Sequence, residues 1–64
     1  MFVNGVEKKA RNGMTLLELI EEEGFDAQRV AVEKNGQIVP KKLFAETILC
    51  DSDKLEVVCF VGGG

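Results

Sequence analysis

Two Asn-Gly pairs, Asn4-Gly5 and Asn35-Gly36, divide this chain into short segments that can pair as antiparallel strands. Both residues accept the positive φ angles of a two-residue hairpin turn, so the dipeptide is a strong local signal for a β-hairpin. We therefore predict one hairpin at the start of the chain and a second in its middle. The predicted strands cover residues 1–3, 6–10, 30–34, 38–39 and 54–61.

A single helix is predicted between the two hairpins. Thr15 is a suitable N-cap, and Glu18, three residues later, completes a capping box. The apolar side chains that share one face at helical spacing are Leu16, Leu19 and Ile20. Gly24 can adopt the left-handed conformation that ends a helix, so we expect the helix to cover residues 16–23.

The order hairpin, helix, strand pair and last strand predicts an α+β fold of the β-grasp, or ubiquitin-like, type. Its mixed sheet has four to five strands, and one helix packs across it. A chain of 64 residues is long enough for one domain with a small core. We assign residues 1–61 to this domain and residues 62–64 to a flexible tail. Residues 51–53 are predicted to be a polar turn before the last strand.

The last strand is apolar on both faces near its end. Alternation places Leu55, Val57, Cys59 and Val61 on the face that the helix covers. In the β-grasp plan the first and last strands are parallel neighbours, which puts Phe2 beside Val58 and Phe60 on the open face. Three such side chains are a candidate docking patch, although loops at the edge of the sheet could also cover them in part.

The chain ends in three glycines, Gly62, Gly63 and Gly64. Residues without a Cβ form a thin stalk that can enter a narrow channel and present the Gly64 carboxylate to another protein, over roughly 10 Å of extended chain. The alternative is a frayed terminus, since chain ends are usually disordered. In the first interpretation Gly64 is the functional group.

Composition excludes several classes of function. The net charge of −3 and the scattered lysines give no basic stripe for nucleic acid, and favour a partner with a basic docking surface. No apolar stretch approaches the 18 residues of a membrane span, and no signal peptide is evident, so we expect no membrane contact and a cytoplasmic protein. The acidic run Glu21–Glu23 is interpreted as a solvated helix end, with contact to a partner as the alternative.

The cysteines give no indication of a metal site. Histidine is absent, and Cys50 and Cys59 do not form a CxxC pair, so the chain has too few soft ligands for zinc or an iron-sulfur cluster. Without a histidine to activate it, neither thiol is expected to be catalytic. We expect Cys59 to be a small buried apolar residue of the last strand.

Taken together, these segments resemble the ThiS family, the sulfur carrier proteins of thiamine biosynthesis. The resemblance covers essentially the whole chain, and the order of the segments with the glycine terminus makes it specific. The segments that carry it are residues 3–5, the helix residues 15–20, residues 30–36 with Ile38-Val39-Pro40, and residues 55–58 leading to 60–64.

The resemblance implies a protein cosubstrate rather than an enzyme. A ThiF-like adenylating enzyme would use ATP and magnesium to convert the Gly64 carboxylate into an acyl adenylate, and this chain itself would bind no cofactor. A persulfide, such as that of a cysteine desulfurase, would then supply sulfur and leave a thiocarboxylate. A ThiG-like thiazole synthase would use that sulfur for the thiazole ring.

Two other classes of function stay open at this point. A related carrier for molybdopterin or transfer RNA thiolation would share the fold, the tail and the chemistry. A ubiquitin-like module that binds its partner without covalent chemistry would need no free carboxylate on Gly64.

Overall fold

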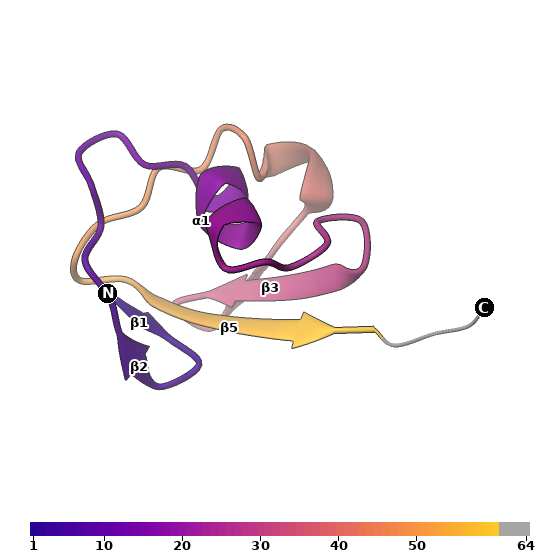
Figure 1. The fold of residues 1–64 in the computed structure, drawn as a ribbon, viewed down its shortest axis with the longest axis horizontal. Helices are drawn as coiled ribbons and strands as arrows, with labels where there is room; N and C mark the ends of the chain where they lie inside the picture. The colour runs from indigo at the N-terminus through magenta and orange to yellow at the C-terminus, as the bar shows by residue number, and fades with distance from the viewer. Residues whose placement is uncertain (61–64) are drawn as a thin grey trace.

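The computed structural model describes residues 1–60, in which a five-stranded mixed sheet carries one α-helix on one face (Figure 1). The strand order is β2-β1-β5-β3-β4. In chain order the elements are β1 (Phe2–Val3), β2 (Val6–Glu7), α1 (Leu16–Glu22), β3 (Val30–Lys34), β4 (Gln37–Val39), the 3₁₀ helix η1 (Lys41–Leu43) and β5 (Lys54–Cys59). This arrangement confirms the predicted β-grasp plan.

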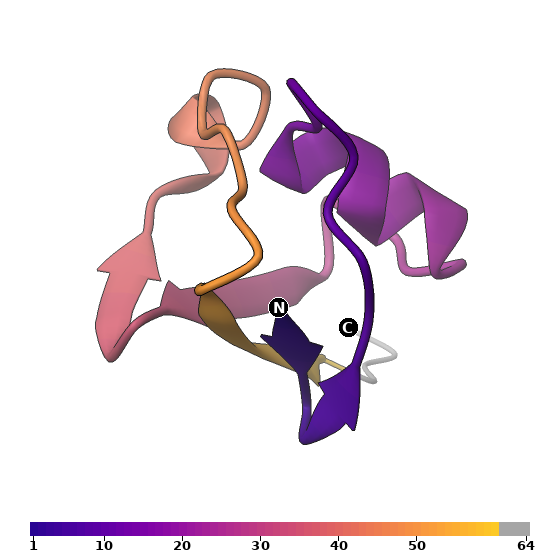
Figure 2. The ribbon, with the colours of Figure 1, turned by 90° about the vertical axis from the view of Figure 1, so that its left-hand side faces the viewer.

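Both predicted Asn-Gly turns are present. The φ angles are 51° and 82° at Asn4 and Gly5, and 53° and 86° at Asn35 and Gly36, so both residues of each turn adopt the left-handed conformation that the dipeptide favours. The first turn joins β1 to β2 and the second joins β3 to β4, each as an antiparallel pair. Strand β2 ends at Glu7, earlier than predicted, and the chain that follows Lys8 leads to the helix (Figure 2).

The capping signals in the sequence set both ends of α1. The Glu18 amide donates to Thr15 Oγ1 at 3.1 Å, and the Thr15 amide donates to Glu18 Oε1 at 2.9 Å, which is the predicted capping box. At the other end Gly24 has a φ of 82°, and the next amide, that of Phe25, donates to the Ile20 carbonyl at 3.0 Å. This bond pattern is a Schellman motif, and it turns the chain back towards the sheet.

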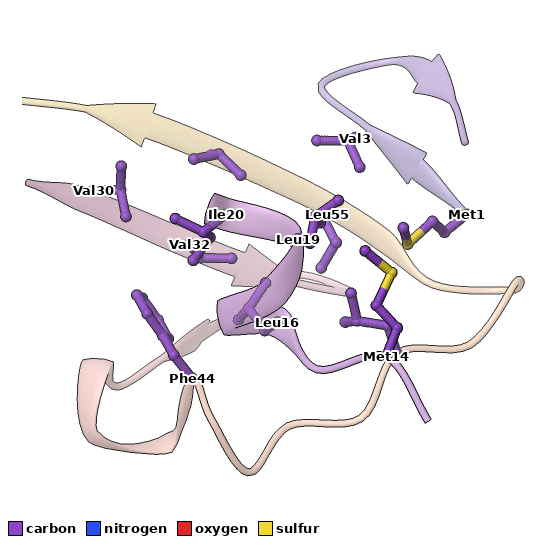
Figure 3. Packing of buried hydrophobic residues seen from close by; sticks show 12 residues of the cluster. Met1, Val3, Met14, Leu16, Leu19, Ile20, Val30, Val32, Phe44 and Leu55 are labelled. Atoms are coloured by element: carbon purple, nitrogen blue, oxygen red, sulfur yellow. The ribbon is translucent and has the colours of Figure 1, made fainter. Parts of the chain in front are cut away.

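The core lies between α1 and the sheet (Figure 3). The three predicted helix residues are 0–2% exposed, and the facing strand residues Val32 and Leu55 are fully buried. Phe44 and Leu49, from the long connection before β5, close one side of this core. The buried hydrophobic residues are Met1, Val3, Met14, Leu16, Leu19, Ile20, Val30, Val32, Phe44, Leu49, Leu55 and Val57.

Strand β5 lies in the middle of the sheet, parallel to β1 and antiparallel to β3. Its contact with β3 covers Leu55 to Cys59, whereas its register with β1 covers Lys54 and Leu55 only. The carboxyl half of β5 therefore has a strand on one side only. Among residues 1–60, no helix has the length and apolarity that a membrane crossing requires.

Candidate functional site

The candidate site begins where β5 ends. Val61 and the predicted glycine tail, Gly62, Gly63 and Gly64, lie outside the described residues, so their role stays a prediction. The structure does fix the point from which they continue, because the Phe60 amide donates to the Arg29 carbonyl at 2.7 Å. A main-chain hydrogen bond to the residue just before β3 thus holds the chain at Phe60, two positions before Gly62.

The other end of β5 is anchored by Asp53, which the sequence indicated only as part of a polar turn. This side chain is buried, with one oxygen 3.0 Å from Asn35 Nδ2 and the other 2.8 Å from the Cys50 amide. Burial would raise the pKa of Asp53, but the hydrogen bonds from Asn35 and Cys50 and the charge of Lys34 outweigh it and lower the pKa below its ordinary value. The Lys34 ammonium lies 3.6 Å away.

The predicted docking residues are all exposed, but the structure does not bring the three together. The exposed fractions are 46% for Phe2, 57% for Val58 and 58% for Phe60. Phe2 pairs with Lys54, so Val58 lies four residues further along β5, about 13 Å away at about 3.3 Å per residue. The expected position of Phe2 beside Val58 is therefore wrong, because the parallel register pairs β1 with the beginning of β5.

Val58 and Phe60 form an apolar surface with a β3 neighbour instead. They follow each other on the open face of β5, and Val58 pairs with Ala31. We call Val58, Phe60 and Ala31 the outer apolar patch. It includes Phe60, from which the chain continues through Val61 to the glycine tail.

An acidic pair lies between this patch and Phe2. Glu33 on β3 pairs directly with Glu56 on β5, so two carboxylates stand opposite each other on the open face. Like charges at directly opposed positions destabilise a sheet. A basic side chain of a partner would relieve this repulsion; the basic docking surface of such a partner stays a prediction. The sequence contained this pair, but only the register of β3 and β5 reveals it.

Carboxylates at the acidic end of α1 form ion pairs with basic residues of the same chain. Glu22 pairs with Arg11, whose Nη1 donates to Oε1 at 2.9 Å, and Glu23 Oε2 lies 3.2 Å from Lys8 Nζ. The hydrogen bond and the charge of Arg11 lower the pKa of Glu22. Two of the three carboxylates of the run 21–23 therefore tie the connection after β2 to the helix end.

Cys59 is exposed, which corrects the expectation of a buried thiol. The alternation along β5 does place Leu55 and Val57 in the core, at 0% and 7% exposure. Cys59 is on the same side of the strand, but it is the last residue of β5 and lies beyond the core residues Leu55 and Val57. Cys50 is exposed as well.

Comparison with known proteins places this chain in a family. The ThiS family matches residues 1–64. The sulfur carrier protein ThiS of Bacillus subtilis is 36% identical over 63 residues, which cover 97% of this chain and 96% of that protein. The crystal structure of the thiamine biosynthesis protein ThiS from Geobacter metallireducens superposes with a TM-score of 0.77 at 30% identity, covering 98% of this chain and 96% of that one.

Thiazole synthases also contain a similar segment. The thiazole synthase of Paramagnetospirillum magneticum is 45% identical over 64 residues, which are 100% of this chain and 20% of that protein. The thiazole synthase of Magnetococcus marinus is 39% identical over 62 residues, or 19% of its length. This chain thus spans about a fifth of the thiazole synthases that it matches. From the match over its whole length and the agreement in fold, this chain belongs to the ThiS family.

Proposed function

We propose that this chain is a sulfur carrier protein of thiamine biosynthesis and that the carboxylate of Gly64 carries the sulfur. The observation that supports this most directly is the match to a curated sulfur carrier over nearly the full length of both chains. The fold is consistent with this, because β5, the strand that precedes the glycine terminus in the chain, lies in the middle of the sheet. The chain is a protein cosubstrate in this proposal, not an enzyme.

The chemistry needs activation because a carboxylate is a poor electrophile at neutral pH. An oxygen of the Gly64 carboxylate attacks the α-phosphate of ATP in a ThiF-like adenylating enzyme that holds magnesium, and pyrophosphate leaves. A persulfide, as formed on a cysteine desulfurase, then attacks the carbonyl carbon and AMP leaves. Two thiols then reduce the resulting S–S bond and leave as their own disulfide, so that a thiocarboxylate remains on Gly64 and the former persulfide ends as a thiol.

The glycine tail suits this reaction. In-line attack on a phosphate requires the carboxylate to enter a closed nucleotide site in one orientation. Gly63 and Gly64 have no side chain to obstruct that entry, and Gly62 adds a hinge. The folded domain stays outside the site.

A thiazole synthase is the proposed acceptor of the sulfur. Two thiazole synthases contain a segment similar to this chain, which supports a physical association between carrier and synthase. The matches to thiazole synthases favour this acceptor over a carrier role in molybdopterin synthesis or transfer RNA thiolation. The open face of the sheet supplies a docking surface, with the outer apolar patch for an apolar contact and the pair Glu33 and Glu56 for a basic one.

Intact mass spectrometry tests the proposal. The chain is incubated with the adenylating enzyme, ATP, magnesium, a cysteine desulfurase with cysteine, and a thiol. Replacement of one carboxylate oxygen by sulfur should raise the mass by about 16 Da, and a variant that lacks Gly64 should show no gain. An unchanged mass of the full chain, with a known carrier converted in parallel, would favour the non-covalent binding module instead.

A further inference from the structure

Strand β5 directs its main-chain groups to two different neighbours. Lys54 and Phe60 point towards β3, since the Lys54 carbonyl accepts from the Asn35 amide at 2.8 Å and the Phe60 amide donates to Arg29. Leu55 points the other way, and its carbonyl accepts from the Asn4 amide at 2.9 Å. Because the direction alternates along a strand, Val57 and Cys59 also face the β1 side.

On the β1 side, the last residue of β5 with a hydrogen-bonding partner in the described part of the chain is Val57. Its partner is the side chain of Asn4, not the main chain of a strand. Asn4 Oδ1 accepts from the Val57 amide at 2.8 Å, and Asn4 Nδ2 donates to the Val57 carbonyl at 3.2 Å. Asn4 already belongs to the turn after β1, with a φ of 51°. The side-chain amide of Asn4 therefore makes the hydrogen bonds that one further residue of β1 would make, and the pairing on this side ends there.

Cys59 is the next residue after Leu55 and Val57 whose main-chain N–H and C=O face the β1 side, and none of the described strands lies beside it there. Among residues 1–60, no group forms a hydrogen bond with its main-chain N–H or C=O. It is nevertheless held in an extended conformation, because Val58 and Phe60 on either side pair with β3. One donor and one acceptor in a fixed strand are the groups that an added strand uses.

We propose that an extended main-chain segment of the activating enzyme adds to β5 at this open edge and forms hydrogen bonds with the N–H and C=O of Cys59. The inference rests on the proposed function. The five residues that follow Cys59 end in the Gly64 carboxylate, which the enzyme has to reach. The three glycines offer no side chain for recognition, so main-chain hydrogen bonds are the means by which an enzyme can align this part of the chain.

Substitution of Cys59 by proline removes the open edge but keeps the hydrogen bonds that hold β5 in the sheet. Cys59→Pro removes the N–H and places a ring on the open side, while the pairing with β3 through Val58 and Phe60 stays. Val58 is already in the extended conformation that a following proline requires. Cys59→Ala is the matched control, because it changes the side chain and keeps the main chain.

The measurement is kcat/KM for ATP–pyrophosphate exchange with the adenylating enzyme. We expect Cys59→Pro to lower it at least tenfold and Cys59→Ala to leave it within about twofold of the original chain, at equal far-UV circular dichroism. Exchange by a folded Cys59→Pro variant at the original rate overturns the strand addition. No exchange with the original chain would instead contradict the proposed function itself.

Amide hydrogen exchange tests the same edge without a substitution, and it decides the question if Cys59→Pro does not fold. The Cys59 amide should exchange freely in the isolated chain and at least tenfold more slowly with saturating enzyme. The Val57 amide, bonded to Asn4, is the protected reference. Unchanged exchange at Cys59 in the complex overturns the proposal. Protection that rises with carrier concentration alone assigns the edge to a second copy of this chain and also overturns it.

Discussion

Asn35 donates a side-chain hydrogen bond to Asp53 at 3.0 Å, although 18 residues separate the two along the chain. The same amide accepts from the Lys54 main-chain N–H through its oxygen, at 2.9 Å. The turn between β3 and β4 thus fixes the first residue of β5. The strand that leads to the tail begins at a buried carboxylate and continues from there through the middle of the sheet.

The Asp53 carboxylate makes the free energy of unfolding depend on pH in the acid range. The pKa of Asp53 is lowered in the folded chain relative to its ordinary value of 3.8, so its contribution is present above that value and is lost as the pH falls through the lower, folded pKa. We expect Asp53→Asn to lower the free energy of unfolding by about 1–3 kcal/mol at pH 7, because an amide cannot accept both hydrogen bonds. The difference from the original chain should shrink below about pH 4.

Urea unfolding between pH 2.5 and 7 measures this difference. Ser52→Ala is the control, since Ser52 is an exposed residue of the same turn, and we expect a change within about 0.5 kcal/mol at every pH. A constant difference between Asp53→Asn and the original chain across this range would mean that the charge of Asp53 does not stabilise the fold.

A side chain in the tail should block activation. Gly63→Val adds a β-branched residue next to the reacting carboxylate, where a narrow channel has no room for it. We expect pyrophosphate exchange with the adenylating enzyme to disappear, as it should when Gly64 is deleted. Thermal unfolding of both variants is recorded alongside as the control for folding. Exchange at the original rate by Gly63→Val would contradict the narrow-channel argument.

The outer apolar patch and Phe2 should contribute unequally to docking. Phe60 is 58% exposed next to the tail, so Phe60→Asp should leave the domain folded and weaken binding to the adenylating enzyme by about 2 kcal/mol or more, as the loss of an interface aromatic often does. Phe2→Asp is the matched variant on β1, beside the first residue of β5, and we expect a smaller loss. Titration calorimetry compares the two, and an equal loss would mean that the docking surface includes β1.

The acidic pair offers a test in which stability and binding move in opposite directions. Glu56→Gln removes one of two directly opposed carboxylates, which should raise the free energy of unfolding by about 0.2–1 kcal/mol. The same change should weaken binding to a partner with a basic surface, more so at low salt. Glu46→Gln, an exposed carboxylate outside the sheet, is the control. Unchanged affinity for Glu56→Gln would remove this pair from the docking surface.

Local signals were enough to predict most of the fold. Each Asn-Gly turn, the capping box at Thr15 and the helix end at Gly24 depend on residues within four positions of one another, so a single sequence contains the whole signal. The length of β2 was overestimated, because no local breaker follows Glu7. Lys8 still exchanges two main-chain hydrogen bonds with Met1, at 2.8 and 2.9 Å, and the chain then leads to the helix.

Contacts between distant residues could not be predicted in this way. The anchors at both ends of the β5 pairing, Asp53 with Asn35 and Asn4 with Val57, join residues 18 and 53 positions apart. Alternation assigned Cys59 to a face of the strand, but it does not say how far the buried core extends along that face. The separation of Phe2 from Val58 likewise depends on the parallel register, which the sequence does not state. The roles of residues 62–64 stay predictions.

The thiols of Cys50 and Cys59 are both exposed. In the proposed chemistry sulfur ends on the Gly64 carbonyl, so neither Cys50 nor Cys59 takes part. A Cys50→Ser, Cys59→Ala double variant should still gain about 16 Da in the complete activating system. Since both side chains are exposed, the change in unfolding free energy should stay within about 0.5 kcal/mol for each substitution. Loss of the mass gain in a folded double variant would mean that a thiol of this chain transfers the sulfur, and that the carrier is not passive.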